Sequence, residues 1–157
     1  MLPKIYIETS VIGYLTARPS RDALARAHQD LTRDWWEYRL NQFEIFVSEV
    51  VLDEIARGDA TAARARVAVV ERYPILRVSD SARNLAAAIL SSAALPAKAA
   101  ADALHISIAA VNGMDFLLTW NCTHIANGII LRAVGKISRE LGFEPPIVCT
   151  PEELMAG

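Results

Sequence analysis

Residues 98–121 read KAAADALHISIAAVNGMDFLLTWN, and the change of pattern within this stretch decides the fold. Its first part is expected to be helical, because Pro96 can occupy a first helical turn and Gly113 can close the helix. The residues that follow, DFLLTW at 115–120, read as a short buried strand. A helix that leads directly into a buried strand is typical of an α/β protein.

The same alternation of helix and strand extends outward over the rest of the chain. We expect four further strands, at residues 4–8, 43–48, 75–79 and 145–150. Helices are expected at residues 9–17, 19–42, 49–58, 59–73 and 79–94, with one or two more at 121–142. A T-P-E-E capping box at 150–153 predicts a last short helix. The order predicts an α/β three-layer sandwich, with helices flanking a mostly parallel central sheet, in a single domain spanning residues 1–157.

The composition excludes several classes of protein. A length of 157 residues allows one well-buried core, and 53% of the residues are hydrophobic. The net charge of −2 argues against a strongly basic nucleic-acid footprint, and two cysteines argue against a disulfide framework. No run approaches the roughly 20 apolar residues of a membrane span, and the start MLPKIYIETS lacks the order of a signal peptide. We therefore expect a cytoplasmic protein without a membrane partner.

Three acidic residues lie in apolar surroundings, where an unpaired carboxylate is costly. Glu8 ends the first expected strand, Glu54 lies in the helix after the second, and Asp102 lies in the helix before the fourth. Because functional groups of a parallel sheet gather at the carboxyl ends of its strands, these side chains could meet at one edge. Carboxylates without dedicated histidine or cysteine ligands favour Mg²⁺ or Mn²⁺, and thus a metal-dependent phosphoester hydrolase. Without metal, mutual repulsion should raise at least one carboxyl pKa.

Each glutamate also has a plainer interpretation. Glu8 could bind backbone amides at the start of the next helix, where the helix dipole favours an acid. Glu54 competes with Glu49 and Asp53 for the inward position on its helix. The dipole explains Glu49 at the helix start, whereas Glu54 lies beside the buried stripe, so Glu54 is the expected site residue.

Asp102 and the polar residues near it also allow structural roles. Asp102 could form an ion pair with Lys98, one helical turn earlier, or a hydrogen bond with His105, three residues later. His105 and His124 lack partners at zinc-ligand spacing and are expected to be hydrogen-bonded structural histidines. Asn121 follows the fourth expected strand and could be the N-cap of the next helix.

Four segments of the chain resemble the PIN-domain nucleases, and in particular their bacterial VapC-like branch. The segments are YIETSVIGYL at 6–15, SEVVLDEI at 48–55, AADALHISIAAVNGMDFLLTWNCTHI at 100–125 and IVCTPEEL at 147–154. The third is the most specific, with an acid in a helix followed by a turn, a strand and T-W-N. The resemblance covers essentially the whole chain and implies a PIN-like fold.

The resemblance implies a small ribonuclease that depends on Mg²⁺ or Mn²⁺ and hydrolyses RNA phosphodiester bonds. In-line attack of water would release the 3′-side oxygen and give a 5′-phosphate product. The residues implied as metal ligands are Glu8, Glu54 and Asp102, and Asn121 would join them in the catalytic set. The residues expected to position substrate or water are Thr9, Ser10 and Thr119.

The chain departs from the family at two positions. The family usually has aspartate where the first strand ends, whereas this chain has Glu8, whose extra methylene moves the carboxylate outward by roughly one bond length. At the fourth acidic position stands Asn121, whose amide cannot neutralise charge, so the residues support one metal held by three carboxylates. These departures allow an alternative function, a catalytically weak or inactive PIN-like module that binds nucleic acid or protein.

The resemblance also implies partners for the chain. RNA would be the substrate, a small antitoxin protein would cover the site in a toxin–antitoxin pair, and a homodimer would be the usual assembly. No glycine-rich phosphate loop of the Walker type is present, so a nucleoside triphosphate is not expected.

Overall fold

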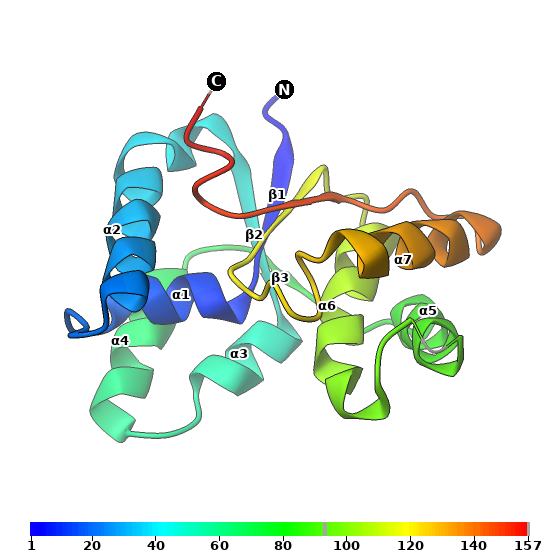
Figure 1. Ribbon diagram of the computed structural model, residues 1–157, viewed down its shortest axis with the longest axis horizontal. Coiled ribbons are helices and arrows are strands. Elements are labelled where there is room, and N and C mark those ends of the chain that lie inside the picture. The colour runs from blue at the N-terminus through cyan, green and yellow to red at the C-terminus, as the bar shows by residue number, and fades with distance from the viewer. Residues whose placement is uncertain (93, 157) are drawn as a thin grey trace.

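The computed structural model describes residues 1–92 and 94–156 and contains a five-stranded sheet (Figure 1). The strands are β1 (Lys4–Ile7), β2 (Glu44–Ser48), β3 (Ile75–Leu76), β4 (Phe116–Leu118) and β5 (Ile147–Cys149). Their order is β3-β2-β1-β4-β5, and every neighbouring pair is parallel. The helices are α1 (Thr9–Thr16), α2 (Ala23–Tyr38), α3 (Glu49–Ile55), α4 (Ala60–Val70), α5 (Asp80–Ser91), α6 (Ala100–Val111) and α7 (Gly128–Glu140).

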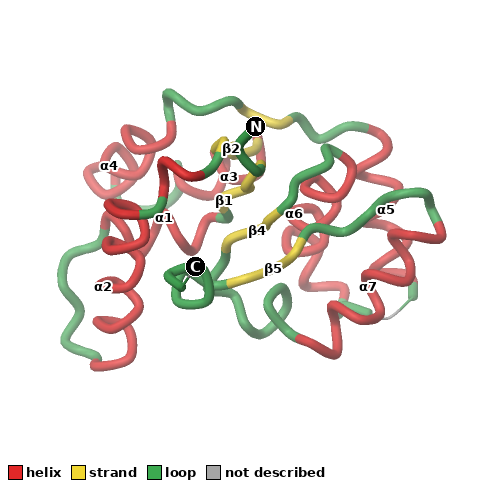
Figure 2. Tube along the Cα trace, turned by 90° about the horizontal axis from the view of Figure 1, so that it is seen from above, coloured by secondary structure: helices red, strands yellow, loops and turns green. Residues whose placement is uncertain are grey.

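Helices cover both faces of the sheet. Figure 2 shows α1, α2 and α4 on one side of the strands and α5, α6 and α7 on the other. Helix α3 follows β2 and contacts α1, α4 and α6. The predicted α/β three-layer sandwich is therefore confirmed. None of the helices formed by the described residues has the length and apolar character that crossing a membrane requires.

Strand β1 lies at the centre of the sheet and is covered on both faces. Its last three residues, Ile5, Tyr6 and Ile7, are fully buried. Ile5 is in register with Ile45 of β2 on one side and with Phe116 of β4 on the other. A parallel strand buried on both faces reads as a continuous apolar run, which explains why KIYI shows no alternation of polar and apolar residues.

Two segments predicted as helical form turns instead. Residues 122–125 are turns, and α7 begins at Gly128 because Asn127 caps it, with Oδ1 accepting from two backbone N–H groups. Residues 151–155 are also turns, although Thr150 and Glu153 form both reciprocal hydrogen bonds of the predicted capping box. So short a segment does not sustain a helix by its cap alone.

The carboxyl ends of β1 and β4 lie side by side, where the strand order reverses. From β1 the chain passes to β2 on one side, whereas β4 and β5 lie on the other. The Glu8 N–H donates to the Leu118 carbonyl at 3.0 Å, so Glu8 and Thr119 leave the sheet as neighbours. Ligands of parallel sheets bind in the crevice at such a switch point.

Candidate metal centre

Glu8 is buried at the carboxyl end of β1, with 5% of its surface exposed. The hydroxyls of Ser10 and Thr119 donate to its Oε1 at 2.5 and 2.6 Å. Glu8 is the N-cap residue of α1, yet its side chain makes no capping hydrogen bond, so binding of backbone amides does not explain its burial. Among the described residues, none donates to Oε2. One oxygen of this carboxylate is held by the protein, and the other has no donor in the part of the chain that the structure describes.

Glu54 reaches the same place from α3. Its Oε1 accepts hydrogen bonds from Thr9 Oγ1 and His105 Nε2, both at 2.6 Å. Burial alone would raise the pKa of Glu54, but the hydrogen bonds from His105 and Thr9 lower it below its ordinary value. The upward pKa shift expected for a cluster of acids is therefore not found at Glu54.

The two competing acids on α3 point elsewhere. Glu49 accepts a hydrogen bond from the Val78 N–H at 2.8 Å through its Oε2, which ties it to the segment after β3. Asp53 is exposed. Glu54 is thus the acid of α3 that lies beside Glu8.

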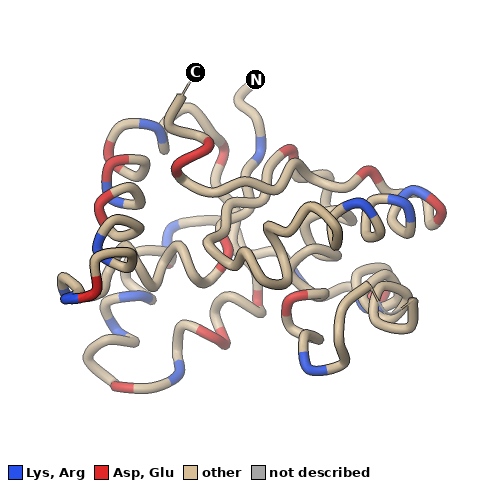
Figure 3. Tube along the Cα trace, in the orientation of Figure 1, with Lys and Arg blue, Asp and Glu red and all other residues tan. Residues whose placement is uncertain are grey.

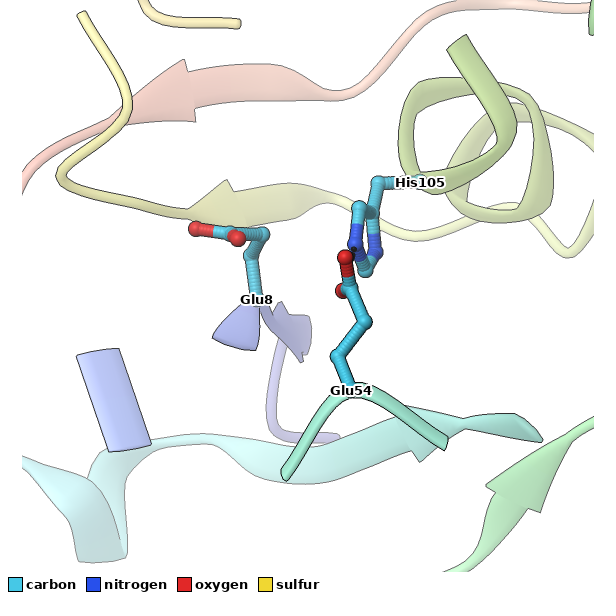
Figure 4. A group of neighbouring side chains, drawn as sticks. All are labelled: Glu8, Glu54 and His105. Atoms are coloured by element: carbon cyan, nitrogen blue, oxygen red, sulfur yellow. Dashed lines mark hydrogen bonds and ion pairs between the residues drawn. The ribbon is translucent and has the colours of Figure 1, made fainter. Parts of the chain in front are cut away.

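Glu8, Glu54 and His105, called here the glutamate cluster, bring their ligand atoms within 4.8 Å of one another (Figure 4). They come from the end of β1, from α3 and from α6. In each glutamate, Oε1 accepts from two protein donors, and no described residue donates to Oε2. Carboxylate oxygens are the ligands that Mg²⁺ and Mn²⁺ prefer, so the residues present fit a divalent cation.

The ring of His105 is buried and engaged at both nitrogens. Besides the contact of Nε2 with Glu54, its Nδ1 lies 2.6 Å from the Tyr6 hydroxyl, which lies 2.7 Å from Ser48 Oγ. Burial raises the pKa of Tyr6, so the phenol stays protonated. In the sequence, the only sign of a role for Tyr6 and Ser48 is their polarity within otherwise apolar strands.

Asp102 belongs to a second group of polar side chains, called here the aspartate cluster, with Asn121 and His124. Its Oδ1 accepts from Asn121 Nδ2 at 3.0 Å, and its Oδ2 lies 2.9 Å from His124 Nδ1. Asn121 Oδ1 accepts the His124 N–H at 3.0 Å, so Asn121 caps a turn rather than a helix. Asp102 therefore pairs with His124, and not with Lys98 or His105, because the loop after β4 folds back onto α6.

Thr119 joins the two clusters. Its Oγ1 donates to Glu8 Oε1 at 2.6 Å and accepts the Asn121 N–H at 2.9 Å. Asp102 itself lies outside the group whose ligand atoms are within 4.8 Å of one another. A cation shared by Glu8, Glu54 and Asp102 thus stays a prediction.

The hydroxyls expected to position substrate or water all contact the glutamates. Thr9 donates to Glu54, and Ser10 and Thr119 donate to Glu8. These bonds orient the two carboxylates. Contact of the same hydroxyls with substrate or water stays a prediction.

Helix α2 fixes the loop that carries Asn121. The Trp120 Nε1–H donates to Thr32 Oγ1 at 2.7 Å, and the Trp120 ring stacks on His28 with centroids 4.0 Å apart. Thr32 and Gln29 are buried although both are polar. Apolar periodicity alone therefore gives no signal for this face of α2.

The sequence matches a known family over most of its length. The profile described as "PIN domain" matches residues 5–121, a range that contains Glu8, Glu54, Asp102 and Asn121. No curated protein matches the sequence.

Two solved structures share the fold. One is VapBC2 from Rickettsia felis bound to a DNA fragment from its promoter, with a TM-score of 0.59, 15% identity, and coverage of 93% of this chain and 97% of that chain. The other is Mycobacterium tuberculosis VapC20, described as a sarcin–ricin loop cleaving toxin, with a TM-score of 0.59, 18% identity, and coverage of 83% and 95%. At these identities the likeness concerns the fold. Together with the match over residues 5–121, it shows that the chain belongs to the PIN domain family, with a fold similar to that of VapC toxins.

Proposed function

We propose that this chain is a Mg²⁺- or Mn²⁺-dependent endoribonuclease and the toxin of a toxin–antitoxin pair. The observation that carries the proposal is the glutamate cluster, in which two oriented carboxylates each keep one oxygen to which no described residue donates. It lies at the carboxyl ends of β1 and β4, where parallel sheets bind their ligands. Membership of the PIN domain family supports the same chemistry.

Glu8 and Glu54 would hold the cation, with Asp102 approaching from α6 and Asn121 ordering the loop beside it. A bound divalent cation lowers the pKa of a coordinated water and offsets charge on phosphate oxygens. Thr9, Ser10 and Thr119 would keep the glutamates oriented, so that little reorganisation is needed when RNA binds. In-line attack of water would leave a 5′-phosphate on the product.

Three observations support the proposed cytoplasmic setting and the proposed partners. Both cysteines are free thiols, which fits the reducing cytoplasm. Basic residues outnumber acidic ones on α4, at one end of the molecule, and on α7, at the other, where they could contact RNA phosphates (Figure 3). The fold shared with VapBC2 and VapC20 supports an antitoxin partner, and by analogy with VapC-like proteins we propose a homodimer.

Incubation of the purified chain with a panel of labelled tRNAs, ribosomal RNA fragments and mRNA tests the proposal. Cleavage should require added Mn²⁺ or Mg²⁺, stop with EDTA, and leave 5′-phosphate ends. RNA that stays intact with both metals at high protein concentration would exclude the nuclease function. Co-expression with the product of a short adjacent gene should protect cells if the chain is a toxin.

The aspartate cluster favours a second candidate, a weak or inactive PIN module that binds nucleic acid or protein. Both oxygens of Asp102 are already engaged, by Asn121 and His124. A site left with two carboxylates would bind metal less firmly than one with three. Mn²⁺ binding and RNA binding without cleavage would identify this alternative.

A further inference from the structure

A buried chain of hydrogen bonds runs from β2 to Glu54. It connects Ser48 at the end of β2, Tyr6 in β1 and His105 in α6, with contacts of 2.7, 2.6 and 2.6 Å. Ser48, Tyr6 and His105 are each fully buried. The chain of hydrogen bonds therefore links strands β2 and β1 to helices α6 and α3, which carry His105 and Glu54 of the glutamate cluster.

The chemistry of each group sets the direction of these bonds. The ionised Glu54 carboxylate can only accept, so His105 Nε2 must carry a hydrogen and donate. In neutral imidazole Nδ1 then accepts, Tyr6 donates to it, and Ser48 donates to the Tyr6 oxygen. Ser48 Oγ accepts the Val51 N–H at 3.2 Å. Every hydrogen in this arrangement has an acceptor.

The reverse direction leaves the chain incomplete. If Nδ1 carried the hydrogen, Tyr6 would donate to Ser48, and no described residue would accept the Ser48 hydroxyl hydrogen. A buried donor without an acceptor is costly. Nε2 would then lack a hydrogen, and its lone pair would face the carboxylate of Glu54 at 2.6 Å.

We infer that His105, Tyr6 and Ser48 are positioning residues, which hold Glu54 for the cation, and that His105 does not bind the cation itself. The inference rests on the proposed metal-dependent function. His105 and Thr9 donate to the same Glu54 oxygen, so they fix the carboxylate, and no described residue donates to its Oε2. Partners that orient a metal ligand in this way commonly change metal affinity about 10- to 100-fold when removed.

Mn²⁺ titration of the full chain, followed by electron paramagnetic resonance, tests the inference without relying on activity. His105→Leu removes the donor and should weaken Mn²⁺ binding about 10- to 100-fold. His105→Gln places an amide N–H near the position of Nε2 and should retain most of the affinity. Tyr6→Phe leaves the His105 tautomer unfixed and should give an intermediate loss. Tyr73→Phe, which removes an exposed hydroxyl bonded to Arg72, is the matched control and should bind as the wild type does.

Thermal melting of each metal-free variant separates lost affinity from lost folding, and affinities are compared among folded variants. Pulsed resonance of the wild-type Mn²⁺ complex should show no directly coordinated imidazole nitrogen. A coordinated nitrogen, or equal losses in His105→Gln and His105→Leu, would overturn the positioning role. Tyr6→Phe with wild-type affinity would overturn the role of Tyr6. A wild-type chain that binds no Mn²⁺ would overturn the proposed metal site itself, an outcome distinct from the others.

Discussion

The glutamate cluster and the aspartate cluster both pair a carboxylate with a histidine, but they differ in how many carboxylate oxygens lack a hydrogen-bond donor. Each joins a carboxylate to a histidine, at 2.6 Å for Glu54 and His105 and at 2.9 Å for Asp102 and His124. The His105 side chain is 1% exposed, whereas that of His124 is 23% exposed. The first pair is set by helices packed on the sheet, and the second by a loop.

Their unused hydrogen-bonding capacity differs more than their geometry. In the glutamate cluster, Glu8 and Glu54 each keep one oxygen that no described residue donates to. In the aspartate cluster, Asn121 and His124 occupy both oxygens of Asp102. In the proposed metal site, the glutamates would therefore have free oxygens for a cation, whereas Asp102 would have to release a partner, or share an oxygen, to join them.

Neutralising Glu8 should have the largest effect. Glu8→Gln keeps the shape of the side chain but removes one of the two charges that face the cation, so metal-dependent RNA cleavage should fall by orders of magnitude. Glu8→Asp keeps the charge, restores the usual residue of the family, and should retain part of the activity. Initial cleavage rates at saturating Mn²⁺ measure both.

The pair of Glu8 variants also has a clear contrary result. Wild-type cleavage that survives Glu8→Gln unchanged would remove the glutamate cluster from the reaction. Metal-free melting temperatures serve as the control, because the Ser10 and Thr119 hydroxyls can still donate to an amide oxygen.

Asp102→Asn should have a smaller effect on metal binding than Glu8→Gln. The variant keeps an acceptor for Asn121 but loses the charge opposite His124, so it tests whether Asp102 acts on the cation or on the loop. We expect the Mn²⁺ affinity of Asp102→Asn to fall about tenfold. The affinity of His124→Gln should fall less, because that variant leaves the Asp102 charge in place. An affinity loss as large as that of Glu8→Gln would show that the two clusters form one metal site.

The sequence predicted the fold well because its signals are local. Strands such as KIYI and FEIFVS are short apolar runs between turns, and their alternation with helices is enough to predict the parallel α/β sheet. The ends of elements were less predictable. Asn127 caps α7, so the helix begins at Gly128 and residues 122–125 form turns. These turns place His124 beside Asp102.

For the candidate site, the sequence predicted that Glu8 and Glu54 meet, but not which residues bind to them. Glu8 and Glu54 stand out as carboxylates in apolar surroundings, and the structure brings them together. The contact of Tyr6 with His105 joins residues 99 positions apart, and no local pattern encodes such a pair. For Asp102, helical spacing suggested Lys98 or His105, but Asn121 and His124, from the loop after β4, are its partners.

Acid should destabilise the wild-type fold more than that of Glu54→Gln. The folded pKa of Glu54 lies below its ordinary value of 4.5, so the ionised carboxylate stabilises the metal-free fold above that pH. This stability is lost as pH falls through the folded pKa. Urea unfolding at about pH 7 and at about pH 4 should show a larger drop for the wild type. Equal drops would mean that His105 and Thr9 do not stabilise the charge of Glu54.

Thiol labelling should show that the loop of the aspartate cluster is more accessible to reagents than the edge of the sheet. We expect the label to change the stability of the fold little. Cys122 is exposed beside Asn121, whereas Cys149 is buried at the end of β5, where burial and then the charge of Glu153 raise its pKa to about 12. Because the thiolate is the reactive form, a small alkylating reagent should label one thiol in the native protein and the second only after unfolding. Cys122→Ser should abolish labelling of the native protein, and mass spectrometry of the digested protein identifies the labelled cysteine.

Labelling at Cys122 should leave Mn²⁺ binding by the glutamate cluster nearly unchanged, since Glu8 and Glu54 are held by hydroxyls and His105. Rapid labelling of both cysteines would show that the sheet edge next to Thr119 opens in solution, and would weaken the contrast between a rigid cluster and a loop-built one.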